Sequence, residues 1–301
     1  MSKKNPEYDF KWCPGCGDFG VKRALEWGME KRNIELEQPM ENTVVMAGIG
    51  CSGNTVHLLD GTQPFGIHGL HGRTLPMAFG IKMGRPDLNV VIVSGDGDFL
   101  SIGGEHIAPQ AQRNLNVTAV VMDNGVYGLT KGQSSPTTEL GVITPTTPFG
   151  KLENAVNPLQ LYMTLGVSFI ASGFSSKVRE LADLIHEGMK HPGFSMVHVQ
   201  SPCTTYNDNF DSLKGNVKKG IDPIAWDIPE DHDPSDRKAA YEILNQGGIP
   251  LGILYKQEDS QPLDARVQAA SEKARSQSVQ QLLASVSNTH LRAHETEADH
   301  V

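Results

Sequence analysis

Four cysteines are the residues of this chain best suited to hold a metal centre. Cys13 and Cys16 are separated by two residues in "KWCPGCGDFG", whereas Cys51 and Cys203 stand alone farther along the chain. A two-residue spacer lets both thiolates turn toward one point, so zinc sites, redox disulfides and iron-sulfur clusters all use such a pair. The pair by itself leaves all three interpretations open.

A second group of residues offers the oxygen ligands of a magnesium site. Asp96 lies in "GDGDF", and Asn124 follows in "DNGV" after one further predicted strand. Magnesium prefers oxygen ligands in octahedral geometry and often combines one or two protein groups with phosphate oxygens. Gly95 and Gly97 would let the backbone approach a diphosphate closely. Because Asp and Gly dominate ordinary turns, the spaced pair is more specific than "GDG" alone.

Alternating strands and helices must position these residues. Apolar runs predict strands over 42–48, 89–94, 117–122 and 194–200, and helical periodicity predicts helices over 18–33, 74–84, 101–114 and 175–192. Asp18 is the expected N-cap of the first helix. The alternation predicts an α/β fold with a mostly parallel, doubly wound sheet covered on both faces. Ligands bind at the carboxyl ends of such strands, so Cys51, Gly95 to Asp98, Asn124 and Cys203 should meet in one crevice.

Composition narrows the classes of function. The chain has 301 residues, 38% of them hydrophobic, and a formal net charge of −9. This acidic balance, without a cluster of Lys or Arg, argues against a nucleic-acid partner. No apolar run approaches the roughly 20 residues of a membrane span, and the polar start "MSKKNPEYDF" suggests a cytoplasmic protein. We expect a cofactor-binding domain over 1–235 and an irregular extension over 236–301 that contacts a partner, is mobile or is a solvated tail.

Six motifs, taken in order, resemble the beta subunits of 2-oxoacid:ferredoxin oxidoreductases, a family of thiamine-diphosphate enzymes. The motifs are "WCPGCGDFG", "GIGCSGN", "HGLHGR", "SGDGDFLSIGG", "YGLTKGQSSPT" and "PCTTYN", and the likeness covers roughly residues 10–206. The thiamine-enzyme signature of Gly-Asp-Gly and Asn-Asn is present, except that Asp123 takes the first place of the Asn-Asn pair. Asn124 keeps the second place, which is the metal ligand in the family.

The resemblance implies three bound groups. One [4Fe-4S] cluster would be held by Cys13, Cys16, Cys51 and Cys203. Mg²⁺ would be bound by Asp96, Asn124 and the backbone carbonyl of Val126. Thiamine diphosphate would be contacted by Ile49, Gly50, Cys51, Ser52, His68, Gly69, Leu70, His71, Gly97, Asp98, Gly128 and Leu129. The catalytic candidates are His71 and Arg73, which could balance the diphosphate or the substrate carboxylate, although Arg73 could instead hold its loop by a salt bridge.

The resemblance also implies an activity and partners. The expected reaction is oxidative decarboxylation of 2-oxoglutarate to succinyl-CoA, in which coenzyme A takes the acyl group and ferredoxin takes single electrons. Reductive carboxylation is its reverse, and pyruvate is the alternative substrate. The activating glutamate would belong to an alpha subunit, so we expect an α2β2 assembly and no activity from this chain alone.

Two other classes of function can be compared with this interpretation. A zinc-stabilised binding module would use the cysteines but has no need of Asp96 and Asn124 at thiamine-enzyme spacing. A nucleotide-binding protein is excluded, because the sequence has no G-x-x-x-x-G-K-[ST] and "GDGDFLSIGG" does not fit G-x-G-x-x-G.

Overall fold

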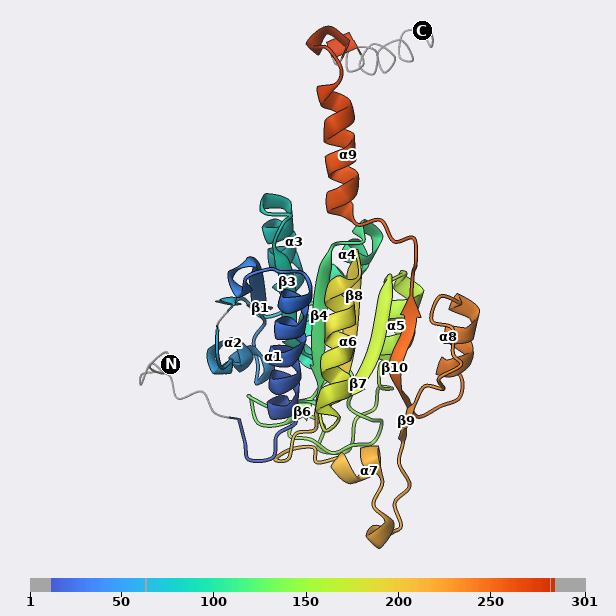
Figure 1. Cartoon of the computed structure of the whole chain (residues 1–301). Helices are drawn as coiled ribbons and strands as arrows, with labels where there is room; N and C mark the ends of the chain where they lie inside the picture. The colour runs from blue at the N-terminus through green and yellow to red at the C-terminus, as the bar shows by residue number, and fades with distance from the viewer. Residues whose placement is uncertain (1–11, 63, 282, 285–301) are drawn as a thin grey trace, which may run out of the picture. The chain divides into compact units, whose positions relative to one another are not determined.

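The structure is a computed structural model that describes residues 12–62, 64–281 and 283–284. The chain divides into two compact units, Met1–Pro262 and Leu263–Val301. The first unit is built on an eight-stranded sheet with the strand order β2-β1-β3-β4-β8-β7-β10-β9 (Figure 1). The second unit contains α9 (Leu263–Arg275), within the range 236–301 that we expected to be irregular.

The sheet is parallel except at one pair of strands. Its strands are β1 (Thr43–Ala47), β2 (Phe65–His68), β3 (Asn89–Gly95), β4 (Val117–Asp123), β7 (Phe169–Phe174), β8 (Phe194–Gln200), β9 (Ala225–Asp227) and β10 (Ile249–Lys256). β10 pairs antiparallel with β7, and the other neighbouring strands run parallel. The short strands β5 (Val126–Tyr127) and β6 (Gln133–Ser134) pair separately. The prediction of a mostly parallel α/β sheet is confirmed.

Helices cover both faces of the sheet, as the sequence predicted. The helices of the first unit are α1 (Asp18–Glu35), α2 (Thr55–Leu58), α3 (Thr74–Gly84), α4 (Ile107–Arg113), α5 (Pro158–Leu165), α6 (Val178–Lys190), α7 (Phe210–Lys214) and α8 (Arg237–Leu244). α1 and α6 contact each other side by side in front of the sheet in Figure 1. Their apolar side chains pack with Val45 and Val91 in one core, whereas residues of α3, α4, α5 and α8 pack with Met46 and Ile92 in the other. Successive residues of a strand point to opposite faces of the sheet, and one layer of helices buries each face.

Two local predictions were wrong. The N-cap position of α1 is Gly17, and Asp18 is instead the first residue of the helix. The Asp18 carboxylate is buried and accepts a hydrogen bond from Ser201 Oγ at 2.6 Å rather than from a helix amide. The helix expected over 101–114 is interrupted, because a π-helical turn occupies Gly97–Ile102 and α4 begins only at Ile107.

The C-terminal division differs from the expected boundary at residue 235. α8 and β10 fall within the range 236–301 that we predicted to be an extension, yet both belong to the first compact unit. The apolar stretch "GIPLGILY" forms most of β10, which pairs with β7 and so extends the main sheet. The second unit begins at Leu263.

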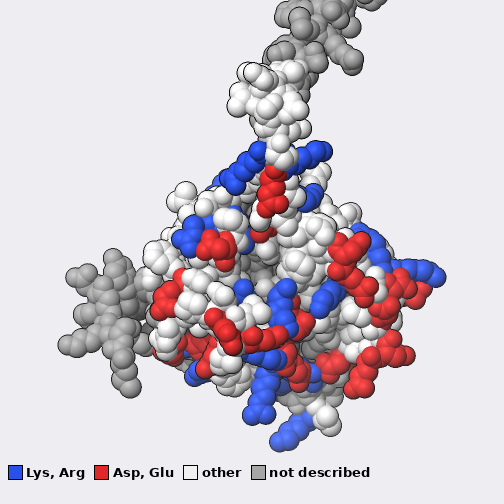
Figure 2. Space-filling view, turned by 45° about the horizontal axis from the view of Figure 1, so that its top comes forward, with Lys and Arg blue, Asp and Glu red and all other residues white. Residues whose placement is uncertain are grey.

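Charges of both signs are mixed on the face of the molecule shown in Figure 2, where Lys and Arg side chains lie among Asp and Glu.

Among the described residues, no helix combines the length and the apolar character that a membrane span requires.

Candidate functional site

The carboxyl ends of β1, β3 and β4 converge on one cavity of about 110 Å³. The loops that follow these strands lie at the lower edge of the sheet in Figure 1. The predicted residues that line the cavity are Ile49, Gly50, Cys51, Ser52, His71, Asp96, Gly97, Asp98, Asn124, Val126, Gly128 and Leu129. We expected Cys51, Gly95 to Asp98, Asn124 and Cys203 to meet in one crevice, and this is confirmed for all of them except Cys203. Cys203 does not line the cavity.

Hydrogen bonds join the three segments that carry the cysteines. Cys16 N donates to Cys13 O at 3.0 Å, which turns the Cys-x-x-Cys loop back on itself. Thr204 Oγ1 donates to the carbonyl of Pro14 at 3.0 Å, and this links that loop to the segment of Cys203. Trp12 Nε1 donates to the carbonyl of Cys51 at 2.8 Å. All four cysteines are free thiols held in one region of the fold.

Gly128 shows how close two of these thiols come to the cavity wall. A β carbon at this position would lie 3.5 Å from Cys51 Sγ and 3.8 Å from Cys203 Sγ. These are ordinary van der Waals distances, so the backbone of the cavity wall at Gly128 lies directly against the sulfurs of Cys51 and Cys203.

The surroundings of the thiols disfavour their ionised form in the protein alone. Burial raises the pKa of Cys16 far above its usual value, and the charge of Asp18 raises it further. The pKa of Cys51 is raised to about 12 by the same two causes, with burial the larger. Thiolates bind metals, so a positively charged centre would have to compensate for the burial of these groups. Within the described residues, no three Cys, His, Asp or Glu side chains are arranged to share a single metal ion.

Asp96 lies in a buried chain of hydrogen bonds. Thr137 Oγ1 lies 2.8 Å from Asp96 Oδ2 and 2.7 Å from Asp123 Oδ1. Asp123 Oδ2 lies 2.9 Å from His198 Nε2, and Tyr162 Oη lies 3.2 Å from the other ring nitrogen of His198. Burial and the nearby charge of Asp123 raise the pKa of Asp96. A cation beside Asp96 would relieve the repulsion between the two carboxylates.

Asn124 and Val126 add two further oxygen atoms that could bind a metal ion together with Asp96. Asn124 Oδ1 accepts a hydrogen bond from Val126 N at 3.0 Å, and Asn207 Nδ2 holds the Asn124 carbonyl at 2.9 Å. Asp96, Asn124 and Val126 all line the cavity. Their carboxylate, amide and carbonyl oxygens are the donor types that magnesium prefers.

Asp98 connects the two loops that flank the cavity. Its Oδ1 accepts hydrogen bonds from Ile49 N at 3.2 Å, from Gly72 N at 2.7 Å and from His71 Nδ1. Its Oδ2 accepts a hydrogen bond from Ser94 Oγ. The carboxylate is thus occupied by protein donors, and it fixes the ring of His71 against the cavity.

The remaining candidates, His68, Gly69, Leu70 and Arg73, do not line the cavity. Arg73 donates to the carbonyls of Gly72 and Ile102, each at 3.0 Å, and forms an ion pair with Glu105 at 3.2 Å. This is the loop-holding salt bridge considered above as its alternative role. His68 Nδ1 lies 2.9 Å from His57 Nε2. Gly69 packs close to methionine side chains, and the exposed Leu70 side chain faces the surface.

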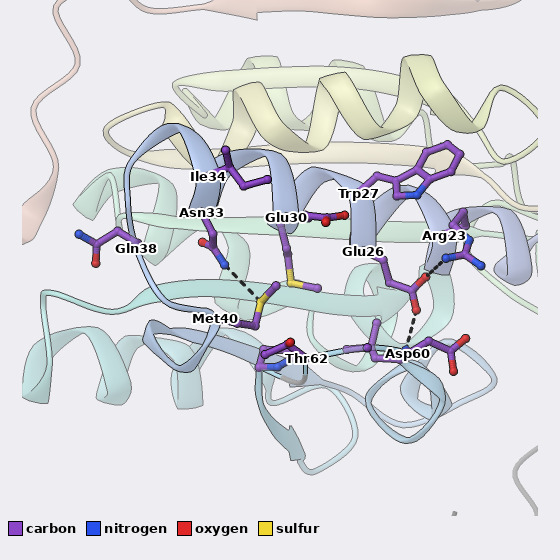
Figure 3. A pocket seen from close by; sticks show the side chains of 14 residues that line it. Arg23, Glu26, Trp27, Glu30, Asn33, Ile34, Gln38, Met40, Asp60 and Thr62 are labelled. Carbon is purple, nitrogen blue, oxygen red and sulfur yellow. Dashed lines mark hydrogen bonds and ion pairs between the residues drawn. The ribbon is translucent and has the colours of Figure 1, made fainter. Parts of the chain in front are cut away.

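A larger hollow of about 470 Å³ lies elsewhere, between α1 and the segment that follows α2 (Figure 3). Glu26 in its wall pairs with Arg23 at 3.1 Å and accepts a hydrogen bond from Asp60 N at 2.7 Å. Asn33 Nδ2 lies 3.3 Å from Met40 Sδ. Neither the four cysteines nor the magnesium candidates Asp96, Asn124 and Val126, which we call the Asp96 group, line this hollow. We therefore assign the cofactor chemistry to the smaller cavity.

Comparison with known proteins agrees with this geometry. A family model described as "Thiamine pyrophosphate enzyme, C-terminal TPP binding domain" matches residues 27–199, and a model of the C-terminal part of pyruvate ferredoxin oxidoreductase beta subunits matches residues 203–272. The chain is 38% identical to a 2-oxoacid:ferredoxin oxidoreductase subunit beta from Sulfolobus sp., over 90% of this chain and 89% of the relative. The chain belongs to the 2-oxoacid:ferredoxin oxidoreductase beta-subunit family. The resemblance inferred from the six motifs is confirmed.

Two further relatives have names that mention 2-oxoglutarate. A 2-oxoglutarate synthase subunit KorB from Archaeoglobus fulgidus is 39% identical over 69% of this chain and 77% of the relative. A solved 2-oxoglutarate:ferredoxin oxidoreductase from Magnetococcus marinus, with 2-oxoglutarate, coenzyme A and succinyl-CoA bound, is 39% identical. Its fold matches with a TM-score of 0.78 over 89% of this chain and 88% of that chain. The chain is therefore a subunit of an oxidoreductase with a thiamine-binding fold.

Sequence reasoning missed three residues that support the site of this beta subunit: Thr137, His198 and Tyr162. Thr137 ends the motif "YGLTKGQSSPT", but its position did not reveal that it reaches both Asp96 and Asp123. His198 was detectable as a histidine within the apolar strand β8. A buried polar residue in such a strand needs a partner, although the sequence does not identify that partner as Asp123.

Proposed function

We propose that this beta subunit acts in the coenzyme A-dependent oxidative decarboxylation of 2-oxoglutarate. The products would be succinyl-CoA and carbon dioxide, and two electrons would pass singly to ferredoxin; the reverse reaction is reductive carboxylation. The observation that carries the proposal is the cavity in which the Asp96 group and Cys51 share one wall. The names of the relatives from Archaeoglobus and Magnetococcus favour 2-oxoglutarate over pyruvate.

Thiamine diphosphate and Mg²⁺ fit the donors that line the cavity. Asp96, Asn124 and the carbonyl of Val126 would bind Mg²⁺, and Gly97, Asp98, Gly128 and Leu129 would flank the diphosphate. At Gly97 a β carbon would lie 2.3 Å from the Tyr127 ring, so the packing of Tyr127 in this wall requires glycine there. When bound, thiamine diphosphate supplies the electron sink that stabilises a carbanion beside a former carbonyl.

Cys13, Cys16, Cys51 and Cys203 would hold the [4Fe-4S] cluster. The raised pKa values of Cys16 and Cys51 fit a site whose thiolates form only with a bound cationic centre. Zinc would also compensate for these charges, but it undergoes no redox change. Cys51 adjoins the cavity, so a redox-active cluster would have a use at this position that a structural zinc ion would not.

His71 is the residue of this chain that we assign to contact with the bound anions. Its Nδ1 is bonded to Asp98, which leaves Nε2 as the ring nitrogen available to a ligand in the cavity. Arg73 would act indirectly. Its guanidinium donates hydrogen bonds to the carbonyls of Gly72 and Ile102, which holds the loop that carries His71 against the segment that carries Ile102. His68, Gly69 and Leu70 remain in the proposed cofactor segment, although the contacts described above tie His68 to His57.

An alpha subunit would complete the active site. The relatives are named as beta subunits, which supports a partner of this kind. We propose that the partner supplies the pyrimidine-binding domain with its activating glutamate, that the assembly is α2β2, and that coenzyme A and ferredoxin bind to this assembly. A cytoplasmic setting belongs to the same proposal, because a reducing compartment keeps the four thiols available.

An anaerobic assay tests the substrate assignment. The chain is co-expressed with its alpha subunit, and reduction of a low-potential dye is followed with 2-oxoglutarate or pyruvate, with and without coenzyme A. We expect coenzyme A-dependent reduction that is faster with 2-oxoglutarate. Faster reduction with pyruvate would assign the alternative substrate, and no reduction with either acid by a thiamine-loaded complex would contradict the proposed reaction.

A further inference from the structure

The loop between β6 and α5 exposes large apolar side chains, and its residue Thr137 contacts Asp96 in the cavity wall. Its stretch from Leu140 to Gly150 contains no charged residue. Phe149 is 96% exposed and Leu152 is 85% exposed, and Ile143 is also largely exposed. Grouped apolar side chains of this kind on a soluble surface mark sites where another protein binds.

This loop is held in a defined shape by its own hydrogen bonds. The side chain of Lys151 is buried, and its Nζ donates to the carbonyls of Ser135, Pro136 and Thr138 at 2.8–3.2 Å. Val156 N donates to the same Pro136 carbonyl at 3.0 Å and closes the base of the loop. The apolar side chains are therefore presented by an ordered frame, which lowers the entropy that a partner must overcome.

The base of the loop is part of the support of the Asp96 site. Thr137, which follows Pro136 in the loop, bridges Asp96 and Asp123. At the other side, Ser134 N donates to Thr146 Oγ1 at 3.2 Å, which ties β6 to the loop. A partner seated on the exposed side chains would consequently adjoin the cavity.

The cavity in this chain is too small to enclose the proposed cofactor. Ligand pockets that bury most of a drug-sized molecule usually measure roughly 300–1,000 Å³, whereas the cavity measures about 110 Å³. Part of a bound thiamine diphosphate would lie outside the wall that this chain provides. A second chain could supply the remaining wall, and the loop after β6 adjoins the Asp96 side of the cavity through Thr137.

We propose that the loop from Leu140 to Leu152, which we name the apolar loop, is a docking surface for the alpha subunit. This inference rests on the proposed function, because it takes the alpha subunit to be the chain that closes the cavity. Phe149 and Leu152 are its principal contacts, and the surface they meet on the alpha subunit is apolar. A docked alpha subunit would lie against the segment that contains Thr137, the residue that is hydrogen-bonded to Asp96.

The test measures assembly of the full-length chains. The variant Phe149→Ser/Leu152→Ser is compared with Ile34→Ser, a matched control because Ile34 is 71% exposed on α1. Dissociation of the complex is followed by sedimentation on dilution. We expect the double variant to weaken the affinity of the two subunits at least about tenfold, which is the usual effect of removing a hot spot, and Ile34→Ser to leave it unchanged. Unchanged affinity of the double variant would overturn the proposal.

A photo-cross-linking residue at position 149 of the assembled complex provides a second measurement that does not depend on folding of the double variant. We expect cross-links to the alpha subunit from position 149, and their absence would overturn the proposal. The wild-type complex is assayed for coenzyme A-dependent oxidation in the same preparation. A complex that assembles through the apolar loop but does not oxidise 2-oxo acids would refute the proposed function and leave the docking surface intact.

Discussion

The hydroxyl of Thr137 stands between the buried carboxylates of Asp96 and Asp123, 2.8 Å from the first and 2.7 Å from the second. A hydroxyl has one proton, so it can donate to only one of these carboxylates at a time. Two carboxylates that share a site repel each other when both are ionised, and the raised pKa of Asp96 reflects this together with burial. The arrangement favours a cation at Asp96.

Replacing Thr137 by Val tests this arrangement with little change of volume. We expect the metal-free chain to lose about 1–3 kcal/mol of its free energy of unfolding, because the carboxylates lose their shared donor. Urea denaturation at pH 7 in the presence of a chelator measures this loss. The matched control Thr164→Val removes an exposed hydroxyl that donates to Gln160 O, and it should cost less than about 1 kcal/mol. Equal effects of the two substitutions would contradict the proposed importance of the bridge.

Replacing Asp98 by Asn tests whether this residue organises the two flanking loops. Asparagine would keep the size of the side chain, but its amide N–H group would face groups that now donate hydrogen bonds to the Asp98 carboxylate, such as the backbone N–H groups of Ile49 and Gly72. We expect a loss of about 3 kcal/mol in the free energy of unfolding, since buried donors would lose a charged acceptor. Thermal or urea unfolding gives the value. Asp183→Asn, which breaks an exposed ion pair with Lys31, should cost about 0–1 kcal/mol, and a similar small cost at Asp98 would argue against its organising role.

Local patterns predicted the fold and the meeting of the loops that follow β1, β3 and β4. The other wall residues followed from the family resemblance, which also named His68, Gly69 and Leu70, residues that do not line the cavity. The helix predicted over 74–84 has the observed bounds of α3, and the strands after which the motifs stand are all present. In a parallel sheet the carboxyl ends share one edge, so residues as distant as Cys51 and Asn124 could be brought together without further information.

Contacts between distant residues could not be predicted in this way. Asp18 has the residue type and position of an N-cap, yet its carboxylate binds Ser201, which lies beyond β8. Similarly, the spacing of Asp98 gave no sign that it would accept hydrogen bonds from Ile49 and Gly72. These partners are set by the packing of loops in three dimensions, which periodicity does not encode.

His191 gives the chain an acid-sensitive component of stability. Burial, with a smaller effect of the Lys256 charge, lowers its pKa to about 4 from an ordinary value of 6.5. Below about pH 6.5 the unfolded chain takes up a proton that the folded chain does not, so this contribution is complete above pH 6.5 and is lost as the pH falls toward 4. We expect a loss on the order of 1–3 kcal/mol, measured by urea unfolding between pH 7 and 4.5. His191→Gln should flatten this dependence, and an unchanged slope in the variant would refute the assignment.

Cys203→Ser tests whether the cluster and the thiamine site are separate. Anaerobically purified complex of the variant should lose its iron and its brown colour, while bound thiamine diphosphate falls by less than about half, because the Asp96 group is unchanged. All four cysteines are proposed ligands, so the matched control is Ser195→Ala, which removes a buried hydroxyl from β8. Full retention of iron in Cys203→Ser would remove this residue from the proposed ligand set.

The most direct test of the central claim, that one chain provides both a thiamine wall and a cluster site, is the metal and cofactor content of the anaerobically purified complex. We predict about four iron atoms and one thiamine diphosphate per copy of this chain after correction for any iron bound by the alpha subunit. Zinc in place of iron, together with an absence of thiamine diphosphate, would contradict the account and favour a zinc-stabilised binding module.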